Sequence, residues 1–200
     1  MQIVLIRHGK TTWNLQRRLQ GRVDIPLCDA GIRELQDRRI PDEWQPDRAF
    51  TSPLSRARMT AAFLGLGHAT IDSRLVEMNF GEWEGQTYAE LHAANPRKLS
   101  ELEDAGLDMQ PPGGETPREA LARFMDFVHE QARSGHERIA IVSHKGLMRA
   151  AMARAAGWDM IGKPPFTIDW SKAQILRLRD DRLEIDRLNL SLETTCPVGS

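Results

Sequence analysis

The sequence predicts an α/β fold: a three-layer sandwich, with helices on both faces of a mostly parallel sheet that has an antiparallel edge strand. Residues 3–6 and 139–142 are continuous runs of aliphatic residues, which is typical of buried strands. Segments with helical spacing separate the expected strands, and this alternation favours parallel strands joined by helical crossovers. Near the carboxyl end, residues 173–186 alternate in polarity around Asp180-Asp181 and predict a hairpin at the sheet edge.

The first half of the chain predicts two short strands and three helices. Residues 11–27 are polar and predict a loop or a short helix. Asp29 is a candidate N-cap, and Pro53 lies near the first position of the following helix. The expected strands are 49–51 and 69–71, and the expected helices are 29–39, 54–64 and 87–94.

The second half contains the best-marked helix start. Thr116, Pro117 and Glu119 form a capping box with proline at the first helical position. A further helix is expected over 146–156, directly after the strand at 139–142. We expect residues 1–193 to form a single domain, with a small helical insert at about 88–112 and a tail at 194–200.

Bulk properties restrict the class of protein. The 200 residues suit one domain, and a net charge of −1 gives no general attraction to nucleic acid or to an anionic membrane. Two cysteines, Cys28 and Cys196, do not form a disulfide framework, which suits a reducing compartment. The chain has neither a membrane-spanning run nor a signal-peptide pattern, so we expect a cytoplasmic protein, and its edge strand makes a homodimer possible.

Two histidines lie just beyond the two aliphatic runs, 3–6 and 139–142. Arg7, His8 and Gly9 end the first strand, and His144 follows the strand at 139–142. Because open α/β sheets bind ligands at the carboxyl ends of their strands, we expect one site built from both halves of the chain.

The residues around these histidines favour phosphate chemistry over a metal. Arg7 and Arg56 present guanidinium donors that match phosphate oxygens in pairs, and neighbouring cations would repel a metal ion. An imidazole can itself carry a phosphoryl group on nitrogen, and the leaving oxygen then needs a proton. Glu77 lies in an apolar context that favours a neutral carboxyl group, and Glu82 is its rival.

Several ordered motifs carry a resemblance to a known family. They are RHGK with Asn14, the segment from Gly21 to Leu27, SPLSRA at 52–57, LxExxFGxWEG around Glu77, Gly113-Gly114-Glu115, and SHKG at 143–146. The chain resembles the histidine phosphatase superfamily, in its phosphoglycerate-mutase-like branch (branch 1). The matches cover most of residues 1–157.

The resemblance implies a role for each matching residue. His8 would be the phosphorylated nucleophile, Arg7, Arg56 and His144 would hold the phosphoryl group, and Glu77 would donate the proton. Substrate-binding positions would be Asn14 and the pocket-lining Gln20 and Gly21. The resemblance implies no metal and no other cofactor.

Departures from the family pattern narrow the predicted function. Lys10 and Lys145 stand where other residues are commoner, and both add positive charge that could reach an acidic substrate. Mutases carry a lysine shortly after the EG turn, where this chain has Gly85-Gln86-Thr87-Tyr88, and an arginine pair whose nearest counterpart here is Arg97-Lys98. We therefore predict a metal-independent phosphatase of a small phosphorylated metabolite, with a phosphoglycerate-type mutase and a non-catalytic phospho-ligand binding module as alternatives.

Overall fold

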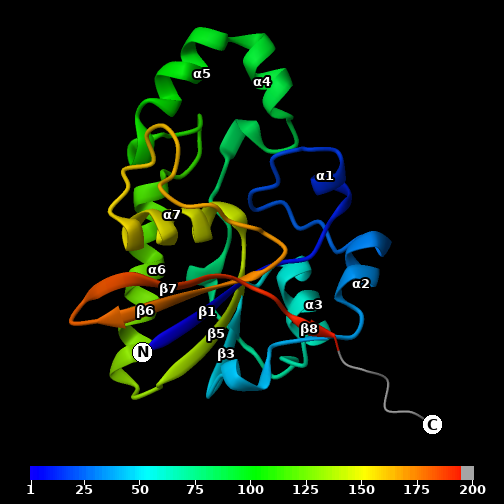
Figure 1. The fold of residues 1–200 in the computed structure, drawn as a ribbon. Coiled ribbons are helices and arrows are strands. Elements are labelled where there is room, and N and C mark those ends of the chain that lie inside the picture. Colours follow the sequence, from blue (N-terminus) through cyan, green and yellow to red (C-terminus); the bar gives the residue numbers. More distant parts are fainter. Residues whose placement is uncertain (195–200) are drawn as a thin grey trace.

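The computed structural model describes residues 1–194, except for the side chains of residues 98, 99 and 103. Among these residues, six strands form the main sheet in the order β4-β3-β5-β1-β6-β7 (Figure 1). The four strands from β4 to β1 are parallel, while β6 and β7 run antiparallel at one edge. The strands are β1 Gln2–Arg7, β3 Arg48–Thr51, β4 Thr70–Ile71, β5 Arg138–Ser143, β6 Ala173–Arg179 and β7 Arg182–Leu190.

Helices cover both faces of the sheet. On one face lie α6 (Pro117–Arg133) and α7 (Lys145–Ala156), and on the other lie α2 (Asp29–Leu35) and α3 (Ser55–Phe63) (Figure 1). The predicted three-layer sandwich, with its mostly parallel sheet and antiparallel hairpin, is confirmed.

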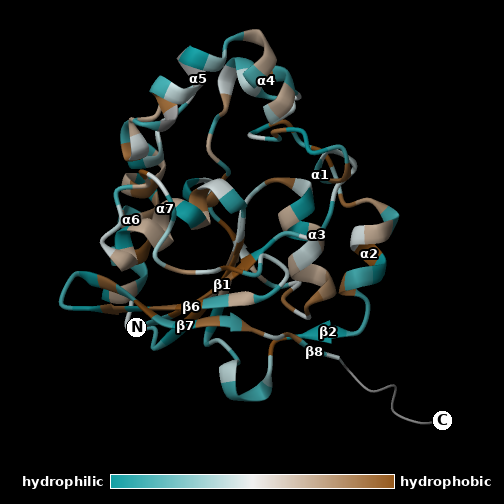
Figure 2. Ribbon diagram, turned by 45° about the horizontal axis from the view of Figure 1, so that its top comes forward, coloured by the Kyte–Doolittle hydropathy of each residue, from teal (hydrophilic) through white to brown (hydrophobic). Residues whose placement is uncertain are grey.

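The apolar residues of the central strands supply both cores. Ile3 and Leu5 pack with α6 and α7, whereas Val4 and Ile6 pack with α3, because successive side chains of a strand point to opposite faces. All four side chains are buried, and apolar residues concentrate along these strands in Figure 2. A strand without a polar face needs cover on both sides, and the two helical layers provide it.

Shorter elements surround the ends of the strands. The helical insert comprises α4 and α5, which lie together at the top of Figure 1. Gly85 and Gln86, which precede the insert, are hydrogen-bonded to Leu19 in the loop after α1. Leu19 N–H donates to the Gln86 carbonyl at 2.9 Å, and Gly85 N–H donates to the Leu19 carbonyl at 2.8 Å. The remaining helices are α1 Thr12–Leu15, α4 Tyr88–Ala94, α5 Pro96–Glu103, and the 3₁₀ turns η1 Asp42–Trp44, η2 Ser73–Leu75, η3 Gly81–Trp83 and η4 Gly106–Asp108.

The predicted helix over 29–39 is too long. It ends at Leu35, and Asp37 adopts a left-handed backbone with φ of 60°, which interrupts an α-helix. The chain then forms β2 (Arg38–Arg39), which pairs with β8 (Glu193–Thr194). Thr194, predicted to begin the tail, therefore belongs to a strand, and the rest of that prediction, 195–200 with Cys196, lies outside the described residues.

The predicted helix starts are partly correct. The capping box of Thr116 and Glu119 is confirmed. For α2 the N-cap is Cys28, so Asp29 lies inside the first turn rather than capping it. For α3 the N-cap is Leu54, so Pro53 lies near the first helical position, directly before the N-cap. No helix of the described residues is long and apolar enough to cross a membrane.

Candidate active site

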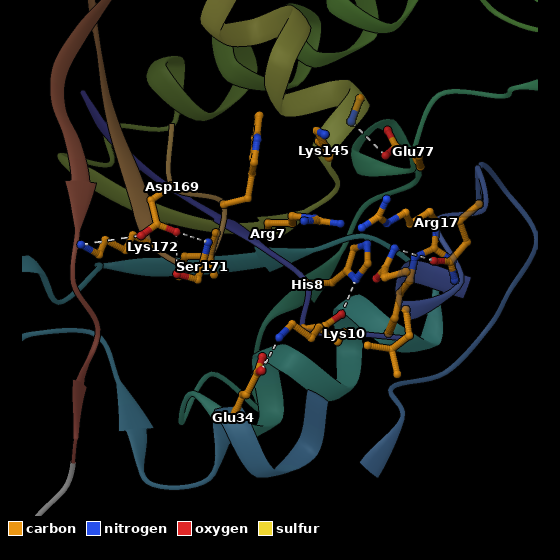
Figure 3. Close-up of a pocket in the computed structure, with 18 of the residues that line it drawn as sticks. Arg7, His8, Lys10, Arg17, Glu34, Glu77, Lys145, Asp169, Ser171 and Lys172 are labelled. Atoms are coloured by element: carbon orange, nitrogen blue, oxygen red, sulfur yellow. Dashed lines mark hydrogen bonds and ion pairs between the residues drawn. The ribbon is translucent and has the colours of Figure 1, made fainter. Parts of the chain in front are cut away.

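The register of the parallel strands brings the predicted site residues to one edge of the sheet. Arg7 of β1 pairs with Ser143 of β5, and Thr51 of β3 pairs with Val142. The residues that follow each strand, His8, Ser52 and His144, therefore leave the sheet side by side. As the sequence predicts, the site is built from both halves of the chain (Figure 3).

His8 is held in one tautomer. Its Nδ1 lies 2.7 Å from the Gly9 carbonyl oxygen, and since a carbonyl only accepts, Nδ1 carries the proton and donates. Burial, with the positive charges of Arg56 and Arg7, holds the pKa of His8 well below 6.5. The ring is therefore neutral at pH 7, with a lone pair on Nε2.

His144 lies against His8 and is fully buried, with the two ring centroids 5.1 Å apart. Arg56 Nε donates to His144 Nδ1 at 3.3 Å, so Nε2 carries the proton and donates to Ser52 Oγ at 2.7 Å. Burial, with His8 and Arg56 nearby, also lowers the pKa of His144 well below its usual value. Both imidazoles are thus neutral bases beside fixed cations.

Arg56 is fully buried and tied to the loop that follows Gln20. Its two terminal nitrogens donate to the Gly21 carbonyl at 2.7 Å and the Val23 carbonyl at 2.9 Å. Burial lowers the pKa of Arg56 to about 10, so the guanidinium remains charged at neutral pH. Neutral acceptors fix its position, and the negative charges of Glu77, Asp24 and Glu84 offset only part of the effect of burial.

Arg7 has a buried donor without an acceptor. Its Nε is buried and makes no hydrogen bond to any described residue. Burial lowers the pKa of Arg7, while the negative charge of Glu77 opposes this effect. A buried, unpaired guanidinium nitrogen is costly, and an anion in the site would satisfy it.

Glu77 is buried and lies at the start of α7. Its carboxylate accepts three backbone N–H groups, from Gly146, Leu147 and Met78, each at 2.9 Å. Gly146 and Leu147 belong to the first turn of the helix, where N–H groups lack partners in the helix itself. The carboxyl group of Glu77 is therefore held in place by three backbone donors.

A cavity of about 1230 Å³ lies over the strand ends. Arg7, His8, Arg56 and Glu77 line it, together with residues of the insert and of the loop before β6. Figure 3 shows His8 and Arg7 between the Lys145 and Glu77 side of the site and the Lys10 and Glu34 side. The rival acid Glu82 is not among the described residues that line the cavity.

The predicted substrate-binding residues differ in their placement. Lys10, Asn14, Gln20 and Lys145 line the cavity. Gly21 is not among the described lining residues; its carbonyl instead accepts from Arg56. Asn14 accepts from Thr11 N–H at 3.1 Å in the capping box of α1, and Gln20 accepts from Thr11 Oγ at 2.9 Å.

Three residues that support the site were not predicted. Ser52 is the hydrogen-bond partner of His144. Asp24 accepts from Ser55 N–H at 2.8 Å and from Ser55 Oγ at 2.7 Å, and so caps α3 from another loop. Glu84 accepts from the N–H groups of Arg22 at 2.8 Å and Val23 at 3.0 Å. The motifs contain all three, but only the folded chain shows what each one holds.

Comparison with known proteins identifies the family. The chain belongs to the histidine phosphatase superfamily (branch 1), whose sequence model matches residues 3–191. The resemblance inferred from the motifs is therefore confirmed. Among the described residues, no group of three or more His, Cys, Asp or Glu side chains is arranged to hold a metal ion.

The relatives include phosphatases. A glucosyl-3-phosphoglycerate phosphatase of Mycolicibacterium vanbaalenii is 32% identical over 80% of this chain and 79% of its own length. A metal-independent phosphoserine phosphatase of Arabidopsis thaliana is 29% identical over 92% of this chain and 79% of its own. A solved mycobacterial glucosyl-3-phosphoglycerate phosphatase, complexed with vanadate (VO3), has a TM-score of 0.78 at 29% identity, covering 95% of this chain and 99% of that one.

Proposed function

We propose that the protein is a metal-independent phosphatase that hydrolyses a small phosphomonoester through a phosphohistidine on His8. The observation that carries this proposal is the neutral His8 ring, whose Nδ1–H is held by Gly9 and whose Nε2 is left unprotonated beside Arg7 and Arg56. An unprotonated ring nitrogen beside two guanidinium groups, of which Arg7 has an unpaired buried Nε, is the arrangement that transfer of a phosphoryl group to nitrogen requires.

In the first step, His8 Nε2 forms a bond to phosphorus while the bond from phosphorus to the ester oxygen breaks. The Gly9 carbonyl stabilises the positive charge that the ring gains, and Arg7 and Arg56 stabilise the charge on the phosphoryl oxygens. Protonated Glu77 gives its proton to the leaving oxygen. In the second step, Glu77 takes a proton from water, which attacks phosphorus and releases His8 and inorganic phosphate.

The mutase and the binding module, the two alternative functions, predict a different fate for the phosphoryl group from hydrolysis. A mutase would return the phosphoryl group to an organic hydroxyl, and a binding module would not turn over its ligand. The names of the relatives favour hydrolysis, since they include phosphatases of phosphoserine and glucosyl-3-phosphoglycerate. The cytoplasmic location, the single domain over 1–193 and the homodimer stay predictions.

A phosphate-release screen over several dozen phosphomonoesters tests the proposal. We expect turnover that persists in EDTA, an acid-labile and alkali-stable phosphoenzyme, and loss of both in His8→Ala. The matched control is His68→Ala, which removes an exposed histidine and should retain full turnover. Normal turnover in His8→Ala would refute the nucleophile. Isomerisation without free phosphate would indicate the mutase, and binding without turnover would indicate the binding module.

A further inference from the structure

The cavity carries far more positive charge than one phosphoryl group needs. Ten Lys and Arg and three Asp and Glu are among the described residues that line it, which gives a formal charge of +7 in a chain whose total is −1. A phosphoryl dianion offsets two of these charges. Because this excess is concentrated around the site, the cavity is suited to a substrate with a second anionic group.

Internal ion pairs neutralise some of these cations. Lys10 forms an ion pair with Glu34 on one side of the site. Lys172 lies 3.7 Å from Asp169, and Arg18 lies 3.6 Å from Glu90. The charge of Lys10 is therefore already balanced by the protein, although the residue lies only two positions from His8.

Lys145, on the other side of the site, has no such partner. Its Nζ lies 5.7 Å from the centroid of the Trp170 ring, and neither an ion pair nor a hydrogen bond joins it to a described residue. Arg149 follows one turn later on α7, also lines the cavity, and lies over Trp158 at 5.2 Å. An aromatic ring attracts an ammonium group without occupying its N–H donors, so the N–H donors of Lys145 remain available.

The position of Lys145 is electrostatically unfavourable in the protein alone. It is the first residue of α7, and the helix dipole disfavours a cation there. Burial lowers the pKa of Lys145, the positive charges of Arg7 and Arg149 lower it further, and Glu77 opposes them. A bound anion would relieve each of these effects.

We propose that Lys145, with Arg149 behind it, binds a carboxylate that the substrate carries close to its phosphoryl group. This inference rests on the proposed function, because it assumes that the phosphoryl group lies over His8. A carboxylate fits because it accepts from a single ammonium group and matches one unit of charge. The substrate class is therefore a phosphorylated hydroxy acid, and Lys145 is the residue that selects it.

A pair of substrates tests the proposal. 3-Phosphoglycerate and glycerol 3-phosphate differ in having a carboxylate or a CH₂OH group, so the ratio of their kcat/KM values measures selection of the carboxylate. We expect Lys145→Met to lower this ratio about tenfold, the size of a hydrogen bond to a charged group, and Lys145→Arg to retain most of it. Lys172→Met is the matched control, since it removes an amine that lines the same cavity and is paired with Asp169, and it should change the ratio less than about twofold.

Other outcomes would overturn the proposal. Equal losses on both substrates would place Lys145 at the phosphoryl group, and an equal effect of Lys172→Met would indicate that the positive charge of the whole cavity selects the carboxylate. Glycerol 1,3-bisphosphate is the third substrate. If Lys145→Met lowers the kcat/KM ratio of glycerol 1,3-bisphosphate to glycerol 3-phosphate and leaves the ratio for 3-phosphoglycerate unchanged, the second anionic group is a phosphate. Absence of all turnover, including that of p-nitrophenyl phosphate, would refute the proposed function. In that case, calorimetry of 3-phosphoglycerate and glycerol 3-phosphate binding to His8→Ala, with and without Lys145→Met, still tests whether Lys145 binds the carboxylate.

Discussion

Gly146 and Glu77 lie so close that no side chain fits between them. The Gly146 amide donates to Glu77 Oε2 at 2.9 Å, and a Cβ on Gly146 would lie 2.6 Å from Glu77 Oε1. The glycine is therefore needed for close approach of the carboxylate to the helix end.

Gly146→Ala should displace Glu77 without weakening the helix. We expect the free energy of unfolding to fall, because the lost hydrogen bonds to the buried carboxylate outweigh the roughly 1 kcal/mol of helix propensity that alanine adds. We also expect kcat for alkyl phosphates to fall about tenfold or more. Nitrophenyl phosphate, whose leaving group needs little proton donation, should lose less. Gly67→Ala is the control, since nothing lies within 4 Å of its added Cβ. Equal losses on both substrates would contradict the proton-donor role of Glu77.

The two arginines of the site should differ in their effect on stability. Arg56→Met leaves the carbonyls of Gly21 and Val23 without their donor, so we expect it to cost about 2–5 kcal/mol. Arg7→Met removes a buried nitrogen that has no partner, so stability should change by less than about 1 kcal/mol or improve. Both variants should lower kcat/KM at least about a hundredfold.

Urea denaturation combined with phosphate-release kinetics checks this contrast. If Arg7→Met is destabilised as strongly as Arg56→Met, the Arg7 guanidinium has a structural partner and is not held ready for an anion.

Acidification should destabilise the protein through its two buried histidines. Burial and neighbouring positive charges hold the pKa values of His8 and His144 well below 6.5, whereas the unfolded chain titrates near the ordinary value. Below about pH 6.5 the unfolded state binds more protons, so the free energy of unfolding falls as pH falls, by up to about 1.4 kcal/mol per pH unit for each histidine.

Urea denaturation at pH 7, 6 and 5 measures this dependence. His8→Asn removes one of the titrating groups and should show a shallower loss than the wild type. His68→Asn, at an exposed position, should follow the wild type. A slope that His8→Asn leaves unchanged would contradict the low pKa of His8.

Asp24→Ala should weaken both α3 and the loop around it. The carboxylate satisfies the Ser55 N–H and hydroxyl groups, and losing such a helix cap costs about 1 kcal/mol. Because the same loop supplies the Val23 carbonyl to Arg56, KM for the phosphate substrate should rise as well. Asp126→Ala, an exposed helical aspartate, is the control for thermal unfolding. No change in either quantity would show that the loop is held without Asp24.

The sequence predicts the fold well where the pattern is local. Residues 3–6 and 139–142 are strands because their apolar runs leave no polar face, and His8 and His144 meet because parallel strands end at one edge. Thr116 and Glu119 cap α6 through a contact that spans only three residues.

The features that the sequence does not predict depend on contacts between segments that are distant in the chain. The strand at Arg38–Arg39 exists because it pairs with Glu193–Thr194, a partner that no local pattern reveals. The unequal roles of Lys10 and Lys145 likewise depend on Glu34 and Trp170, neighbours that appear only after folding. Residue types at strand ends thus indicate the chemistry, but the partner of each side chain does not follow from them.

The hydrogen bonds that join Leu19 to Gly85 and Gln86 have a consequence for protein engineering. These hydrogen bonds hold the loop after α1 and the segment before the helical insert together, although Gly85 lies 66 positions after Leu19 in the chain. An insert transplanted alone from a relative would arrive without the backbone partners that orient it. Chimeras intended to exchange substrate preference therefore need to exchange both segments together.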